Sequence, residues 1–195
     1  MDILKAMRIY TNFLPFYFIL FACNEGQNSE KGIKTVHSQV EQTKPKEIPQ
    51  RNILVIKAVK KFGPDISSTY QKAGCTEVVI KIIEKFYKLE DTDKKRIRII
   101  TSENIQDLLK ADSPIPKGVY YALLEKNIGL SIDQEDVLEG DFVQFWTGTW
   151  GHCGIVKSIH LEEKEMELYS SFPSTNGYGI QKFAIPKHSF FVRLK

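Results

Sequence analysis

A helix-period stripe in the middle of the chain is the feature that most constrains its fold. Apolar residues recur there in pairs every four positions, at Val78, Val79, Ile82, Ile83, Phe86 and Tyr87. This spacing gathers the apolar side chains on one side of an α-helix. Residues 75–87 are therefore predicted to form a central helix with a buried side.

Other helices are predicted on both sides of the central one. Apolar residues over 53–62 have near-helical spacing, and Gly63 and Pro64 are expected to end that helix. Shorter helices are predicted over 102–110 and 117–126, with a proline-containing segment between them.

After residue 140 the pattern changes from a helical period to the alternation of strands. Strands are predicted over 142–146, 152–159, 165–171, 178–184 and 190–194. Turn residues such as Gly148 and Gly177 separate these segments. Helices followed by an antiparallel meander predict an α+β fold, with the central helix packed on the sheet.

The first 22 residues have the pattern of a targeting segment. Lys5 and Arg8 precede a mostly apolar run over 9–22, which is short for a permanent membrane span. Residues 20–23 read Leu-Phe-Ala-Cys and resemble a bacterial lipobox, which implies that Cys23 becomes the new N-terminus and carries acyl chains. An ordinary secretion signal, or an uncleaved helix, is the alternative interpretation.

Composition and charge define the rest of the organisation. Residues 23–50 are polar with little apolar periodicity, so they are expected to form a flexible tether before one domain over 51–195. The chain has 27 Lys and Arg against 24 Asp and Glu, a formal net charge of +3. Because the two signs are interleaved, no nucleic-acid partner is expected. We expect a monomer that reaches the membrane through N-terminal acyl chains.

Cys75 and His152 are the candidate catalytic residues. Cys75 lies in the first turn of the central helix after Gly74, and His152 begins a strand between small neighbours. A helix N-terminus lowers the pKa of a thiol and a nearby imidazole accepts its proton, so this pair suits nucleophilic attack on a carbonyl. Free amides of the first turn, including that of Cys75, would stabilise the oxyanion.

Other interpretations of these residues stay open. Cys75 and Cys153 are the only other cysteines besides Cys23, and in an exported protein they can form a disulfide. Strand alternation points Cys153 away from His152 and predicts a buried core residue. A zinc site of both cysteines with His152 is conceivable, but the CxxC or HxxxH spacing that supports such a site is absent, and no metal is predicted.

Three segments together resemble the NlpC-type and CHAP-type cell-wall cysteine peptidases and amidases. They are Cys75 at its helix start, residues 138–145 (Leu-Glu-Gly-Asp-Phe-Val-Gln-Phe) and residues 151–156 (Gly-His-Cys-Gly-Ile-Val). These families carry a nucleophile followed by Ser or Thr, an LxxGDLVFF-like strand and a GHVGIV-like strand. The resemblance covers about residues 51–195 and implies a small papain-like α+β domain.

The resemblance also implies a function. It points to an exported, lipid-anchored hydrolase of the bacterial cell envelope that cleaves amide bonds, in peptidoglycan stem peptides, without a cofactor. Cys75 would attack the carbonyl, and His152 would take the thiol proton and return it to the leaving amine. Two alternatives remain: a non-catalytic peptide- or glycan-binding lipoprotein of the same fold, and a Cys–His acyl or peptidyl transferase.

The residue that orients His152 is expected on the neighbouring strand. The face of that strand carrying Ser170 is otherwise apolar, so it is predicted to face the central helix and the site. Ser170 is therefore the predicted orienting residue, with Ser171 and Asn176 as alternatives.

Aromatic residues near the site are candidates for binding substrate. Tyr70, Trp150 and Tyr178 are predicted to contact the substrate, and Trp146 to line the same cleft. A core position is the alternative for each of the aromatic strand residues.

Overall fold

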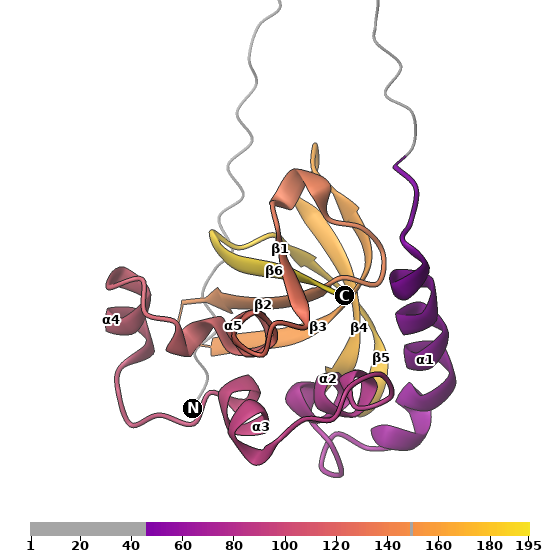
Figure 1. Ribbon diagram of the computed structural model, residues 1–195, viewed down its shortest axis with the longest axis horizontal. Helices are drawn as coiled ribbons and strands as arrows, with labels where there is room; N and C mark the ends of the chain where they lie inside the picture. Colours follow the sequence, from indigo (N-terminus) through magenta and orange to yellow (C-terminus); the bar gives the residue numbers. More distant parts are fainter. Residues whose placement is uncertain (1–45, 149) are drawn as a thin grey trace, which may run out of the picture. The chain divides into compact units, whose positions relative to one another are not determined.

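Along the sequence, the α-helices precede the strands of the sheet, which confirms the predicted α+β order (Figure 1). The computed structural model describes residues 46–148 and 150–195, which belong to one unit of the chain. The predicted signal peptide, Cys23 and most of the predicted tether lie outside the described residues. Within the described part of the chain, no helix is long and apolar enough to cross a membrane.

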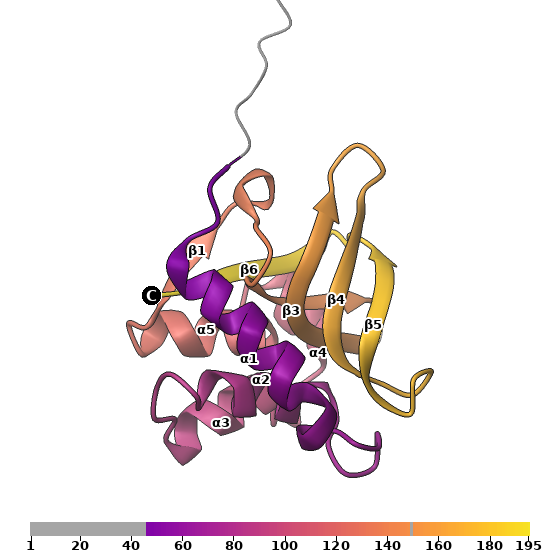
Figure 2. The same ribbon diagram turned by 90° about the vertical axis from the view of Figure 1, so that its right-hand side faces the viewer.

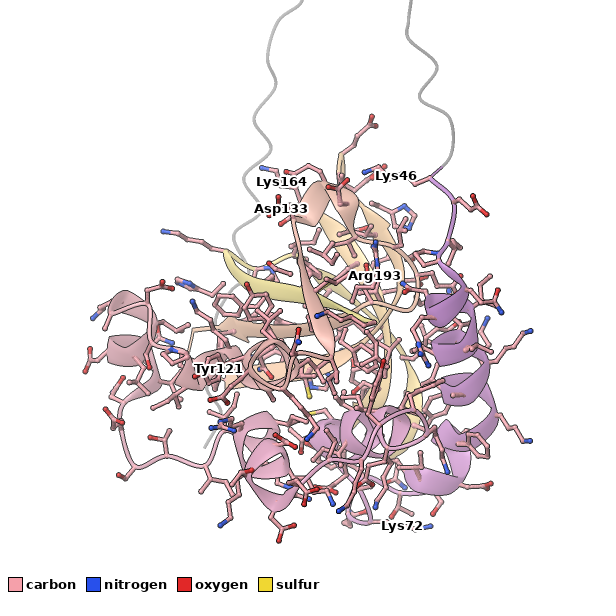
Figure 3. All side chains as sticks on the ribbon, viewed as in Figure 1. Lys46, Lys72, Tyr121, Asp133, Lys164 and Arg193 are labelled. Atoms are coloured by element: carbon pink, nitrogen blue, oxygen red, sulfur yellow. The ribbon has the colours of Figure 1, made fainter. Side chains whose placement is uncertain are left out.

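Lys46, near the end of the predicted tether, contacts the domain. Its ammonium group pairs with the carboxylate of Asp136 and donates to the carbonyl of Glu135, and Figure 3 shows Lys46 at the same end of the domain as Asp133. The first helix begins soon afterwards at Gln50, just before the predicted domain start at residue 51.

Five α-helices and two short 3₁₀ turns are found in the described residues. They are α1 (Gln50–Ile66), α2 (Cys75–Ile83), α3 (Asp91–Arg98), α4 (Ile105–Lys110), η1 (Ile115–Lys117), α5 (Gly118–Glu125) and η2 (Gln134–Asp136).

Helix α2 is the central buried helix that the apolar stripe predicts. It begins at Cys75, and the side chains of Val78, Val79, Ile82 and Ile83 are fully buried. The helix ends at Ile83, earlier than predicted, because the backbone amides of Lys85 and Phe86 bond to carbonyls three residues back and tighten the chain into a turn.

The predicted end of α1 at Gly63 and Pro64 is wrong, because the helix continues to Ile66. Pro64 cannot donate to the carbonyl of Lys60 four residues back, so one helical hydrogen bond is missing, but the helix continues for two more residues. Gly63 is needed for packing: a Cβ atom there would lie 2.3 Å from the ring of Tyr178. The glycine therefore allows close approach to the sheet.

Helix α3 was not predicted. Its sequence is mostly charged, and Ile97 is its only buried apolar residue, so it lacks an apolar stripe. Its start is marked by Asp93, whose carboxylate accepts a hydrogen bond of 2.9 Å from the backbone amide of Glu90. This local acidic cap was the available sequence signal.

The sheet has six strands, and every neighbouring pair is antiparallel. The strands are β1 (Gly129–Ile132), β2 (Phe142–Thr147), β3 (Trp150–His160), β4 (Glu165–Phe172), β5 (Gly177–Ala184) and β6 (His188–Leu194). Their order is β1-β6-β2-β3-β4-β5, so the predicted meander holds for β2 to β5 while β6 returns to pair with β2. The short strand β1 was not predicted.

The two faces of the sheet bury different clusters. Helices α1 and α2 pack on the face that carries Phe142, Ile155 and Tyr169 (Figure 2). The opposite face buries a second cluster, to which Met166 and Leu168 belong. The prediction that the Met166, Leu168 and Ser170 face of β4 meets the central helix is therefore wrong.

A buried ion pair joins β6 to the turn before β2. Asp141 is completely buried and accepts two hydrogen bonds of 2.7 Å from the guanidinium of Arg193. The same carboxylate accepts from the amide of Asn52 on α1 at 2.7 Å and from the backbone N–H of Leu138 at 2.8 Å. The aspartate of the 138–145 segment thus has a structural role.

Candidate active site

Cys75 is the first residue of α2, as the sequence predicts. Gly74 before it has extended backbone, and no side chain caps the helix. The first backbone N–H groups of a helix have no partner within it, so amides of this turn are available next to the sulfur. This arrangement favours negative charge at Cys75 and beside it.

Two buried serines hold the backbone just before the nucleophile. The hydroxyls of Ser67 and Ser171 lie 2.6 and 2.7 Å from the carbonyl oxygen of Ala73, and 2.7 Å from each other. Ser67 follows α1 and Ser171 lies on β4, so the pair ties the loop before Cys75 to two elements. The role of Ser67 was not predicted.

His152 lies near the start of β3, opposite Phe145 of β2, and its ring is enclosed by aromatic side chains. It stacks on Phe172 with ring centroids 5.0 Å apart and an angle of 20° between the planes. Phe145, Trp150 and Phe183 lie within 6.2 Å of the imidazole, measured between centroids.

The imidazole has one buried nitrogen without a partner. Nε2 of His152 makes no hydrogen bond with any described residue. No polar side chain among the described residues orients the ring through this nitrogen, so aromatic packing holds the imidazole on that side.

The sulfur of Cys75 contacts both Cys153 and His152. Hydrogen bonds from the Cys153 thiol and from the imidazole outweigh the effect of desolvation and lower the pKa of Cys75 to about 4. Cys153 is fully buried, and its contact with Cys75 together with burial raises its own pKa well above the ordinary value. At neutral pH the negative charge therefore resides on the sulfur of Cys75. Cys75 and Cys153 are free cysteines and form no disulfide with each other.

The predicted hydrogen bond between Ser170 and His152 is not found. The hydroxyl of Ser170 donates to the carbonyl of Cys153 at 2.8 Å. Of the alternatives, Ser171 bonds to Ala73, and Asn176 lies in the turn between β4 and β5, where its backbone N–H donates to Pro173. None of the three residues forms a hydrogen bond with Nε2 of His152.

Two cavities meet at the candidate pair. The larger one, about 480 Å³, is lined by Tyr70, Trp150, Phe172 and Phe183 besides Cys75 and His152. Tyr70 and Trp150 thus lie where substrate contact is predicted. Tyr178 does not line either cavity, because its ring packs against Gly63 of α1.

The smaller cavity, about 210 Å³, shares Cys75, Gly151 and His152 with the larger one and is more polar. Its lining includes Trp146, Gln144, Glu103 and Arg98, and the guanidinium of Arg98 pairs with Glu77 at 2.6 Å.

Gln144 is a further residue of this site that was not predicted. Its amide group is buried, donates to the carbonyl of His152 at 3.1 Å, and leaves Oε1 without a partner among the described residues. The signal in the sequence was one amide side chain within an otherwise apolar strand.

No family model matches the chain, and no curated protein matches it significantly. Across residues 46–148 and 150–195, no group of three or more His, Cys, Asp or Glu side chains is arranged to hold a metal ion.

Proposed function

We propose that this protein is a cysteine hydrolase of amide bonds, with Cys75 as nucleophile and His152 as general base and acid. One observation carries the proposal: a thiol at the start of a buried helix contacts an imidazole, and its pKa is lowered to about 4. A strongly lowered thiol pKa beside a cavity is characteristic of nucleophilic cysteines.

In the proposed reaction the thiol proton of Cys75 is transferred to His152, and the resulting thiolate is the nucleophile. The sulfur attacks the carbonyl carbon, and N–H groups of the first turn of α2 stabilise the oxyanion that forms. His152 then donates this proton to the leaving amine, and the C–N bond breaks. Water attacks the resulting thioester, gives its proton to His152, and releases the carboxylic acid and the thiolate.

The aromatic enclosure replaces the polar orienting group that the sequence led us to expect. The stacked ring of Phe172 restricts rotation of the imidazole, and the faces of aromatic rings attract a cation. An imidazolium formed during the reaction is thereby stabilised without a carboxylate.

The resemblance of residues 138–145 and 151–156 to NlpC-type and CHAP-type enzymes supports peptidoglycan stem peptides as the substrate and a papain-like fold. The lipobox-like residues before Cys23 support an exported protein anchored in the envelope by acyl chains. Both proposals rest on the sequence.

The experiment is digestion of purified peptidoglycan and its soluble muropeptides by the full-length protein, followed by mass spectrometry. We expect pairs of products whose summed mass exceeds that of the intact muropeptide by one water, and no such products from Cys75→Ala. If muropeptides stay intact after incubation with the folded wild-type protein, the proposal that they are the substrate is wrong.

A non-catalytic binding module is the second candidate, and the unpartnered Nε2 of His152 is the observation that favours it. It predicts muropeptide binding that is equal in the wild type and Cys75→Ala, without turnover of any amide. A transferase would instead yield products in which an added amine, and not water, has taken the acyl group.

A further inference from the structure

Apart from the candidate pair Cys75 and His152, the wall of the larger cavity is uncharged. None of the described residues that line it is Asp, Glu, Lys or Arg. Its aromatic side chains come from distant parts of the chain: Tyr70 precedes α2, Trp150 begins β3, Phe172 ends β4 and Phe183 lies on β5.

Two of these aromatic residues present open surface. Trp150 is 48% exposed and Tyr70 is 38% exposed, whereas Phe172 is buried behind them. Burying apolar surface against such rings contributes roughly 25 cal/mol for each Å² removed from water. Trp150 and Tyr70 are therefore available to cover a ligand.

The polar groups of this wall are neutral. The hydroxyl of Ser174 donates to the amide oxygen of Gln181 at 3.0 Å, so these two side chains already satisfy one another in part. A charged ligand group would lose its water here without gaining an opposite charge, which is unfavourable. The smaller cavity differs, because Arg98 and Glu103 line it.

We propose that the larger cavity is a subsite for an uncharged, apolar or aromatic group of the substrate, adjacent to the bond that Cys75 attacks. This inference deepens the proposed function and rests on Cys75 being the reactive group. On the side of the scissile bond that enters this cavity, substrates with a free carboxylate or ammonium group are disfavoured, and charged parts of the substrate belong on the side of Arg98.

Alkylation of Cys75 tests the subsite without requiring turnover. The probes share an iodoacetamide group and differ in the tail: phenethyl, aminoethyl or carboxyethyl. The rate at Cys75 is followed by peptide mass spectrometry of the full-length protein, and each rate is divided by that of the same probe with glutathione.

We expect the phenethyl probe to react at Cys75 at least about tenfold faster than either charged probe after this correction, a ratio typical of a hydrophobic subsite. In Trp150→Ala, the corrected rate of the phenethyl probe should become nearly equal to the corrected rates of the charged probes. Leu130 is an exposed residue of β1, and Leu130→Ala should leave the wild-type ratio of corrected rates unchanged. Equal corrected rates in the wild type, or a ratio that survives Trp150→Ala, would overturn the inference.

A second variant covers the case in which Trp150→Ala disturbs the fold. Gln181→Glu keeps size and can still accept from Ser174, but it adds a negative charge to the wall. We expect it to shift the preference from the phenethyl probe toward the aminoethyl probe, and Gln134→Glu, outside both cavities, to cause no shift. An unchanged preference in folded Gln181→Glu would contradict the assignment of this cavity.

The subsite and the hydrolase can fail separately. A preference for the phenethyl probe without hydrolysis of any amide supports the subsite and contradicts the enzyme. Hydrolysis of muropeptides without a preference among probes contradicts the subsite alone.

Discussion

The buried thiol of Cys153 is hydrogen-bonded to the sulfur of Cys75, and this contact is the largest cause of the lowered pKa of Cys75. His152 contributes as well, so adjacent residues of β3 both act on one sulfur. The helix start of α2 thus meets β3 at a thiol donor and an imidazole, and the nucleophile does not depend on His152 alone to be ionised.

Cys153→Ala tests this contact through the pH dependence of Cys75 alkylation by iodoacetamide. In the wild type the rate should fall with decreasing pH only near pH 4, because the thiolate persists down to its pKa of about 4. Removing the thiol of Cys153 raises the pKa of Cys75, so the midpoint of the pH profile of alkylation should move to higher pH. Cys153→Ser, which keeps a hydrogen-bond donor, is the control, and an unchanged midpoint in Cys153→Ala would show that the contact has no effect.

Mild oxidation provides an independent test of the same contact. A peroxide oxidises the Cys75 thiolate to a sulfenic acid, and the Cys153 thiol then displaces water to form a disulfide. We expect the wild-type protein to lose two hydrogens and to regain them with a dithiol. Cys153→Ala should instead acquire oxygen atoms at Cys75, and identical products from both proteins would contradict the proximity of the sulfurs.

The stacking of Phe172 on His152 should affect catalysis. Phe172→Leu keeps an apolar side chain but removes a ring interaction worth about 0.5–1.5 kcal/mol, so kcat/KM should fall about two- to tenfold. Phe191→Leu is the matched control, since Phe191 is buried in the same cluster but makes no ring contact with His152. Equal losses in both variants would show a general packing effect.

Periodicity predicted most of the fold, because α2 and strands β2 to β6 carry their apolar residues at the spacing of their own geometry. It failed where burial is slight or the element is short, as in α3 and β1. It also failed on the orientation of β4: alternation separates the two faces of a strand, but both faces of this sheet are buried, so apolar character does not tell which one meets α2.

The candidate site was predictable only in its local parts. The helix-head position of Cys75 and the strand position of His152 follow from neighbouring residues in the sequence. The Ser67–Ser171 contact joins residues 104 positions apart, and the aromatic enclosure of His152 brings together four strands, β2 to β5. Such contacts depend on strand order and register, which the sequence pattern does not specify.

The buried pair of Asp141 and Arg193 should contribute strongly to stability. Arg193→Met leaves Asp141 buried without its partner, and breaking such a pair costs about 3–5 kcal/mol. Lys182→Met breaks the partly exposed pair with Glu165 and should cost at most about 1 kcal/mol. Urea unfolding followed by circular dichroism measures both, and similar losses in the two variants would contradict the role of burial.

The two serines near Ala73 should act as a unit on the position of Cys75. Each hydroxyl alone can serve the Ala73 carbonyl, so Ser67→Ala or Ser171→Ala should have a small effect. The double variant leaves a buried carbonyl without a donor, which costs about 1–3 kcal/mol and allows the loop before α2 to shift. We therefore expect the loss of kcat in the double variant to exceed the combined effects of the single variants, with little change in KM.

Ser131→Ala, an exposed serine of β1, is the control for the loss of a hydroxyl. Effects that simply add, or a change confined to the free energy of unfolding, would show that the serines stabilise the fold without positioning the nucleophile.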